Sequence, residues 1–157
     1  MPYNWTPCLS DKPECKWVGT FCNADGNVTG IIFKKNGMSG TLPTEFTVLS
    51  FLEALVIEGG DAYGNIPQNI GDLQKLKFID LSDNKLTGTL PKSLYDINTL
   101  VQLDLSQNQL TGPMSSDIGS MESLEFLQLD GNQLSGNVPK ELANLNSLRK
   151  YFCVTNF

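Results

Sequence analysis

Histidine is absent from the 157-residue sequence. Its absence removes the side chain that most often transfers protons near neutral pH, and with it every Ser/His or Cys/His nucleophile pair. Carboxylate and lysine chemistry stay available. The composition therefore lowers the expectation of an enzyme without excluding one.

Basic clusters and long apolar runs are also absent. The formal net charge is −6, and basic residues form no more than short pairs such as Lys34-Lys35, so a nucleic acid would be repelled by the average field. No apolar run reaches the ~18 residues of a membrane span. Residues 1–5 lack the charged and apolar regions of a signal peptide. We expect no nucleic-acid partner and no direct membrane insertion, in a chain that is either cytosolic or had a leader replaced at Met1.

A repeat of 24 residues organises the sequence. Leu76, Leu100, Leu124 and Leu148 recur at this spacing, and Leu52 and Val28 extend the register backwards. Each repeat has apolar residues at positions 1, 4, 6 and 11, Asn at 9, Gly at 13, an apolar-Pro pair at 15 and 16, and apolar residues at 19 and 22, with few exceptions. Such a period predicts a solenoid.

The spacing within a repeat predicts its local structure. Positions 4 and 6 point to one side of a short strand, and positions 3, 5 and 7 point to the other, so stacked repeats form a parallel sheet with one buried face. Positions 19 and 22 anchor an irregular or short helical segment on the convex side. The expected strands lie near residues 31–33, 55–57, 79–81, 103–105, 127–129 and 151–153. The Asn residues at position 9 are expected to bond to the backbone of the adjacent coil as a ladder: Asn36, Asn84, Asn108, Asn132 and Asn156.

Two repeats depart from the pattern. The second has Gly60 at the Asn position and Ala62 at position 11, and the fourth has Ser115 at the Pro position. Drift in a tolerant loop explains both departures. For residues 59–63, a loop reshaped for a ligand is the alternative.

These repeats resemble the plant-specific leucine-rich-repeat family, whose consensus is LxxLxLxxNxLxGxIPxxLxxLxx. Residues 15–22, CKWVGTFC, are similar to the family's CxWxGVxC cap motif, with Thr20-Phe21 where Val and a polar residue are usual. The resemblance implies an α/β fold: a right-handed solenoid with a parallel sheet on the concave face and short helical or 3-10 segments on the convex face. It implies a cap over residues 1–27 and a solenoid over residues 28–157, with five complete repeats and the strand of a sixth.

The cap motif implies a disulfide between Cys15 and Cys22, a suitable staple for a small cap. Cys8 is either unpaired or the partner of Cys15 or Cys22 in another connectivity. Cys153 falls on an inward-facing position too far along the stack to reach the cap, and we expect a buried thiol. With no His and no CxxC, we expect neither a metal nor a cofactor. Glycosylation sequons at Asn4 and Asn27, together with the disulfide, favour an extracellular or cell-surface protein.

The concave face is the expected binding surface, because its side chains are free of packing. We expect Phe78 and Phe126 to be exposed there beside carboxylates, an arrangement typical of interface hot spots, although isolated surface phenylalanines are the plain alternative. The candidate ligand-binding residues are Phe78, Asp80, Gln102, Asp104, Phe126, Gln128 and Asp130. The expected function is non-catalytic recognition of a protein, a peptide or a glycan.

Several narrower functions remain open. The family implies an inhibitor of a secreted hydrolase, such as a polygalacturonase, or a fragment of a receptor ectodomain. A row of small hydroxyls at position 12 makes ice binding a remote alternative, although Tyr63 interrupts the row. Asp80 and Asp104 should lie ~5 Å apart, near the spacing in a retaining glycosidase, but an open face cannot raise one pKa. At the C-terminal edge we expect either a truncated sequence or association with a partner near Tyr151, Phe152 and Phe157.

Overall fold

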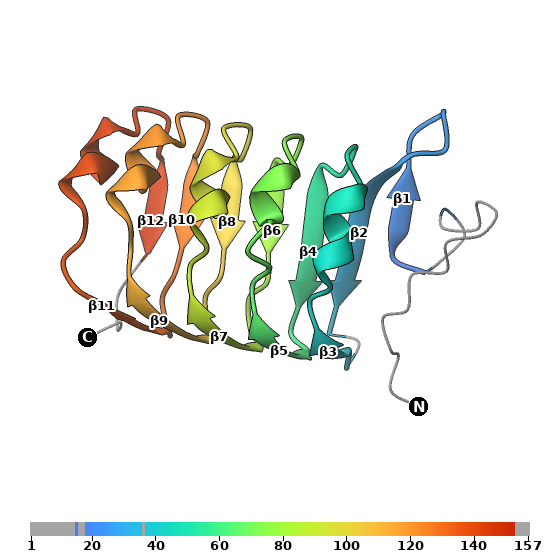
Figure 1. The fold of residues 1–157 in the computed structure, drawn as a ribbon, viewed down its shortest axis with the longest axis horizontal. Helices are drawn as coiled ribbons and strands as arrows, with labels where there is room; N and C mark the ends of the chain where they lie inside the picture. Colours follow the sequence, from blue (N-terminus) through green and yellow to red (C-terminus); the bar gives the residue numbers. More distant parts are fainter. Residues whose placement is uncertain (1–14, 16–17, 36, 153–157) are drawn as a thin grey trace.

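Residue 15 and residues 18–35 and 37–152 are described by a computed structural model, which shows a solenoid of stacked coils (Figure 1). Each coil contributes one strand to a seven-stranded sheet, which we call the concave sheet. In spatial order its strands are β1 (Thr20–Cys22), β2 (Val28–Lys34), β4 (Ala54–Glu58), β6 (Phe78–Asp80), β8 (Gln102–Asp104), β10 (Phe126–Gln128) and β12 (Lys150–Phe152). Several residues singled out in the sequence lie outside the described ones: Asn4, Cys8, Asn36, Cys153, Asn156 and Phe157.

The alternation of side chains in the concave sheet is as predicted. Strands β2 to β12 pair in parallel, and β1 pairs antiparallel with β2 at the cap end. Ile79, Leu103 and Leu127 at position 4 are fully buried, whereas their neighbours at positions 3 and 5 are partly or largely exposed. The fold is therefore an α/β solenoid with one buried sheet face.

The strands from β6 onwards begin and end one residue earlier than predicted. In the turn after these strands, position 8 adopts a left-handed backbone, with φ of 56° at Asp83, 53° at Gln107 and 68° at Gly131. Only one of these three is glycine, the residue that adopts this conformation without strain. The residue types at position 8 therefore do not predict this left-handed turn.

A second parallel sheet was not predicted. It runs along one side of the solenoid (Figure 1), in the order β11-β9-β7-β5-β3. Its strands are β3 (Ser39–Thr41), β5 (Asp61–Asn65), β7 (Lys85–Thr89), β9 (Gln109–Pro113) and β11 (Gln133–Ser135). Position 11 points inward, as Leu86 and Leu110 do, while positions 10, 12 and 14 are more exposed. This alternation over positions 10–14 was the available signal for a strand.

Short 3-10 helices cover the side of the core opposite the concave sheet (Figure 1). They are η2 (Thr44–Val48), η3 (Ile70–Asp72), η4 (Lys92–Asp96), η5 (Ser116–Ser120) and η6 (Lys140–Asn144). In the fourth repeat, Ser115 replaces proline before η5, and its hydroxyl accepts a hydrogen bond from the backbone N–H of Asp117 at 3.1 Å. The missing proline is thus replaced by a capping side chain.

Asparagines at position 9 form the predicted ladder in the third, fourth and fifth repeats. Asn108, for example, donates to the carbonyls of Leu81, Leu105 and Ser106 and accepts from the N–H of Leu86. Asn84 and Asn132 make the equivalent bonds one repeat away. Each amide thus joins two coils and satisfies buried backbone groups that would otherwise cost free energy.

The second repeat lacks this asparagine for a steric reason. A Cβ on Gly60 would lie 2.9 Å from the carbonyl oxygen of Met38 and 3.3 Å from Oδ1 of Asn84. The following residues, Asp61–Asn65, form β5, which pairs with β3 and β7 in the second sheet. The segment is thus regular, which favours the interpretation of a tolerated departure over a loop reshaped for a ligand.

Candidate functional site

All seven candidate ligand-binding residues lie on the concave sheet or directly after one of its strands. Phe78, Gln102 and Phe126 are in register across β6, β8 and β10 and form one row. Asp80, Asp104 and Gln128 form the next row on the same strands, and Asp130 follows β10. Parallel pairing at a spacing of ~4.8 Å therefore brings these side chains together on one face.

Serine hydroxyls hold the carboxylates of the second row. Oδ1 of Asp80 accepts hydrogen bonds from the backbone N–H of Ser82 at 3.2 Å and its hydroxyl at 2.6 Å. Asp104 accepts from Ser106 in the same way, at 3.0 and 2.6 Å. The two carboxylates are consequently fixed in the same orientation in adjacent repeats.

The ionised form of Asp104 is disfavoured. Burial raises the pKa of the Asp104 carboxyl, hydrogen bonds from Ser106 lower it, and the negative charges of Asp80 and Asp130 raise it further. The net result is a pKa above the ordinary value of 3.8, so the expectation that the open face leaves no carboxyl with a raised pKa was wrong for Asp104. A ligand cation beside this carboxylate would offset the free-energy cost of burying its charge and the repulsion from Asp80 and Asp130.

The charges beside the row form ion pairs, but those of the row do not, although Lys34 and Asp80 attract each other at longer range. Lys34 pairs with Glu58 at 2.7 Å, and Lys77 pairs with Glu53 at 2.7 Å. Among the described residues, no ion pair involves Asp80, Asp104 or Asp130. Gln107 donates an amide hydrogen bond to Asp130 at 3.3 Å without neutralising it. The middle of the concave sheet is therefore negatively charged.

The two phenylalanines differ in their exposure. Phe78 is 43% exposed, as predicted, whereas Phe126 is only half-buried and not openly exposed. Phe126 has Gln102 and Lys150 as its neighbours in the row, both long side chains. Phe78 has Ala54 on one side. The expected exposure is therefore found for Phe78, whereas Phe126 is exposed only in part.

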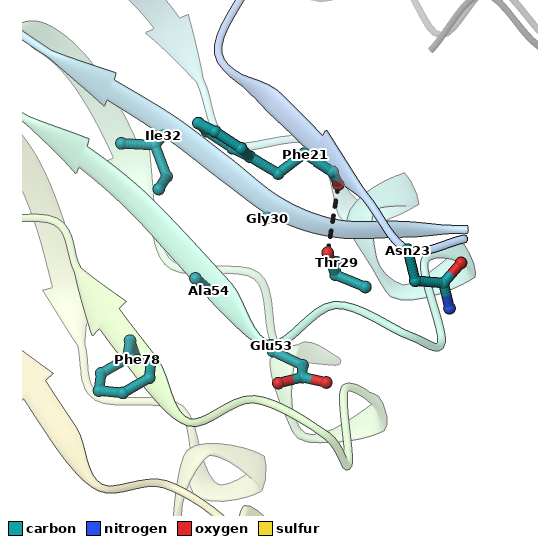
Figure 2. A pocket seen from close by; sticks show the side chains of 8 residues that line it. All are labelled: Phe21, Asn23, Thr29, Gly30, Ile32, Glu53, Ala54 and Phe78. Carbon is teal, nitrogen blue, oxygen red and sulfur yellow. Dashed lines mark hydrogen bonds between the residues drawn. The ribbon is translucent and has the colours of Figure 1, made fainter. Parts of the chain in front are cut away.

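The small residues beside Phe78 leave a hollow of about 430 Å³ at the cap end of the concave sheet (Figure 2). Gly30 and Ala54 line it on β2 and β4, between Phe21 on one side and Phe78 on the other. The remaining lining residues are Asn23, Thr29, Ile32 and Glu53. We call this feature the cap hollow.

Phe21 forms one wall of the cap hollow because Gly30 has no side chain. A Cβ on Gly30 would lie 3.3 Å from the Cβ of Phe21. Strand β1 is held in place by pairing with β2, by a 3.4 Å hydrogen bond from the Thr29 hydroxyl to the Phe21 carbonyl (Figure 2), and by a disulfide between Cys15 and Cys22. The disulfide implied by the cap motif is thus present, and neither of its cysteines is available to Cys8.

Sequence reasoning missed the cap hollow. Phe21 was noted only as part of a departure from the cap motif, and Gly30 and Ala54 were not singled out. The sequence pattern that could have predicted it lies at position 3 of the repeats. The first two repeats have the small residues Gly30 and Ala54 there, and the later repeats have larger residues, beginning with Phe78. Among the described residues, no group of His, Cys, Asp or Glu side chains could hold a metal ion. The arrangement offers binding chemistry, through apolar contact and negative charge.

Comparison with known proteins identifies the family to which this chain belongs. Residues 59–155, more than half of the sequence, match the family described as a leucine-rich repeat region. The chain belongs to the leucine-rich-repeat family.

Its relatives among known proteins are plant receptors. The LRR receptor-like serine/threonine-protein kinase RGI3 of Arabidopsis thaliana is 36% identical over 70 residues, which are 44% of this leucine-rich-repeat chain and 6% of RGI3. The chain thus spans a small part of that relative. This fold is typically a non-catalytic recognition module, and the similarity to kinases concerns the repeats.

Two solved structures resemble the whole described fold. The ectodomain of the receptor kinase SOBIR1 from Arabidopsis thaliana superposes with a TM-score of 0.80 at 27% identity, covering 87% of this chain and 80% of SOBIR1. The plant peptide hormone receptor RGFR1, solved in complex with RGF2, gives a TM-score of 0.79 at 35% identity, covering 85% of this chain and 20% of RGFR1. Within the described part of our chain, no helix is long and apolar enough to cross a membrane.

Proposed function

We propose that this chain is the ligand-recognition part of a receptor-like extracellular protein and binds a peptide or a protein segment on its concave sheet. The carboxylates of Asp80, Asp104 and Asp130, which form no ion pair with a described residue, and the exposed ring of Phe78 beside them carry the proposal. Burying an unpaired charge costs free energy unless a partner supplies the opposite charge, and exposed aromatic rings supply contact area.

The comparisons favour a receptor over a hydrolase inhibitor. RGI3 and SOBIR1 are receptor kinases, and the RGFR1 structure contains a receptor with a bound RGF2. A peptide or protein ligand also suits the surface better than a glycan, because the row presents fixed negative charges that a cationic side chain would neutralise. The organisation that we propose is a cap over residues 1–27 and a solenoid over residues 28–157.

An extracellular location is supported by the disulfide and by the sequon at Asn27, which lies partly exposed in the turn between β1 and β2. Expression in a secretory eukaryotic host should give a glycan on Asn27 that is lost in Asn27→Gln, as measured by peptide mass spectrometry. The second sequon, at Asn4, lies outside the described residues and would be read in the same experiment. Unmodified asparagines at both sites would argue against this part of the proposal.

The binding face is tested by selecting random linear peptides from a display library on the wild-type chain. The double variant Phe78→Ala/Phe126→Ala removes the two aromatic side chains of the Phe78-Gln102-Phe126 row and should weaken the selected peptides by about tenfold or more, as loss of a hot spot does. Exposed Val48 on the opposite side of the core provides the control, since Val48→Ala should leave binding unchanged. Peptides that bind the wild type and the double variant equally would place the binding face elsewhere.

A further inference from the structure

We infer that the cap hollow and the Asp80/Asp104 pair form a two-point site for a peptide that carries a large apolar side chain and a basic side chain three or four residues apart. This inference rests on the proposed function and specifies its ligand. It joins two features that lie on the same face of neighbouring strands, β2 and β4 for the hollow and β6 and β8 for the carboxylates.

The cap hollow has the size and lining of an apolar subsite. Its volume is about 430 Å³, and it is an open depression lined mostly by apolar surface and not an enclosed pocket. Phe21 and Phe78 are 54% and 43% exposed, high values for aromatic side chains on a sheet, and both face the small residues between them. Insertion of one large apolar side chain would remove part of this apolar lining from water, which is the main source of free energy in such contacts.

The charges beside the cap hollow determine which kind of ligand side chain would bind next to it. Glu53 at the edge of the hollow is paired with Lys77 at 2.7 Å, so the hollow itself attracts no strong charge. Asp80 and Asp104 have their Oδ1 atoms bonded to Ser82 and Ser106, and no described residue forms an ion pair with them. An arginine or lysine of the ligand would therefore meet two oriented carboxylates that form no ion pair with a described residue.

The sheet geometry sets the spacing between the two points. The centre of the hollow lies between β2 and β4, and the carboxylates lie on β6 and β8, two strand steps further along the sheet. Two steps of ~4.8 Å combined with two residues along a strand of ~3.3 Å each give a separation of roughly 12 Å. An extended peptide advances ~3.3–3.6 Å per residue, so about three or four residues span this distance.

The experiment uses the same display library of random linear peptides and reads the sequences that are enriched. We expect a large apolar residue and an Arg or Lys three or four positions apart, on either side of one another. Ala54→Leu fills the hollow from its floor and should weaken these peptides by about tenfold. Ala143→Leu makes the same change at an exposed position in η6 and should have no effect. Phe21→Ala removes one wall and gives a second, independent test of the hollow.

The carboxylates are tested with Asp80→Asn/Asp104→Asn, which keeps an oxygen acceptor for each serine while removing both charges. Binding should fall about tenfold at low salt and less at high salt, whereas Asp96→Asn at an exposed position in η4 should leave it unchanged. Circular dichroism and thermal unfolding check that each variant is folded.

The outcomes separate the two proposals. Peptides that are lost with Phe78→Ala/Phe126→Ala but retained by both Ala54→Leu and Phe21→Ala would overturn the two-point site and leave concave recognition standing. Peptides that all variants retain would overturn both proposals. Enriched peptides without a basic residue at the stated spacing, or no enrichment over bare support, would also overturn the two-point site.

Discussion

The free energy of unfolding that is lost when a side chain is truncated depends on which face of its strand the side chain occupies. Leu105 is fully buried between the concave sheet and the rest of the core, while Phe78 three positions into the previous repeat is 43% exposed. Leu105→Ala should therefore lower the free energy of unfolding by ~2–5 kcal/mol through lost packing. Phe78→Ala should change it by no more than ~0.5 kcal/mol. Urea unfolding followed by circular dichroism measures both, and equal losses would show that Phe78 supports the fold.

Asp104 gives a prediction about pH. Because its folded-state pKa lies above the ordinary value of 3.8, its contribution to stability is fully present below pH ~3.8 and is lost as the pH rises through the folded-state pKa. Asp104→Asn should therefore be more stable than the wild type at pH 7, and the difference should vanish near pH 3. Urea unfolding at the two pH values, with Asp96→Asn as an exposed control, measures it. A less stable Asp104→Asn at pH 7 would mean that the bonds from Ser106 outweigh burial and repulsion.

At the scale of single residues, the sequence predicted which way a side chain points but not how open its surroundings are. The period of two in each strand placed Phe78, Asp80, Asp104 and Phe126 on the correct face. Exposure depends on neighbours that lie 24 residues away in the sequence, such as Ala54 beside Phe78 and Lys150 beside Phe126. Comparison of each row across repeats, with attention to side-chain size, would have found both the hollow and the covered ring.

At the scale of the repeat, restoring the family consensus is not always stabilising. Gly60→Asn would complete the ladder, but its Cβ would lie 2.9 Å from the Met38 carbonyl oxygen, a backbone atom that cannot move alone. We expect the free energy of unfolding to fall by ~1–3 kcal/mol, as in other overpacked positions. Gly60→Ala carries the same Cβ without the amide, so it should be destabilised as well. Thermal and urea unfolding measure both variants, and a more stable Gly60→Asn would show that the ladder outweighs the close contact.

The cap element depends on its disulfide. Cys15 and Cys22 close a short loop that carries β1, and the N–H of Ile32 in β2 donates to the Gly19 carbonyl within it. Cys15→Ser/Cys22→Ser should lower the free energy of unfolding by ~2–4 kcal/mol. Hydrogen exchange should show faster loss of the Ile32 amide proton, since the loop that supplies its acceptor is released. Mass spectrometry of non-reduced peptides provides the covalent control, and two free thiols in native secreted protein would contradict the prediction.

Elements of the fold differed in how well the sequence predicted them. The concave strands and the asparagine ladder follow from residues that repeat at fixed positions, so both were predicted. The second sheet was missed because its strands have a single buried apolar residue, such as Leu86, flanked by Thr and Gly residues that are also typical of turns. The 3-10 geometry of the convex segments was expected only as one of several short forms, since two apolar anchors fix the position of a segment but not its hydrogen bonding.

At the scale of the whole molecule, repeats stacked in one dimension produce a surface and not an enclosed pocket. Each coil contacts its neighbours, so the framework residues of one repeat resemble those of the next, and ligand specificity rests on the exposed rows. The net charge of −6 adds a general attraction for cations, which acts over longer distances than the contacts of the concave sheet.

Local and overall charge can be separated by two reversals that alter the net charge equally. Asp104→Lys and Asp96→Lys each change it by +2, from −6 to −4, but Asp104 lies on the concave sheet and Asp96 lies in η4 on the opposite side. For a basic peptide selected on the wild type, Asp104→Lys should slow association by about tenfold at low salt, because like charges then meet at the site. Asp96→Lys should slow it much less, since the Debye length at 0.1 M salt is only ~10 Å.

Stopped-flow association rates over a range of salt concentrations measure the difference, which should shrink as salt rises. If both reversals slow association equally, the ligand responds to the net charge of the solenoid and not to the carboxylates of the concave sheet.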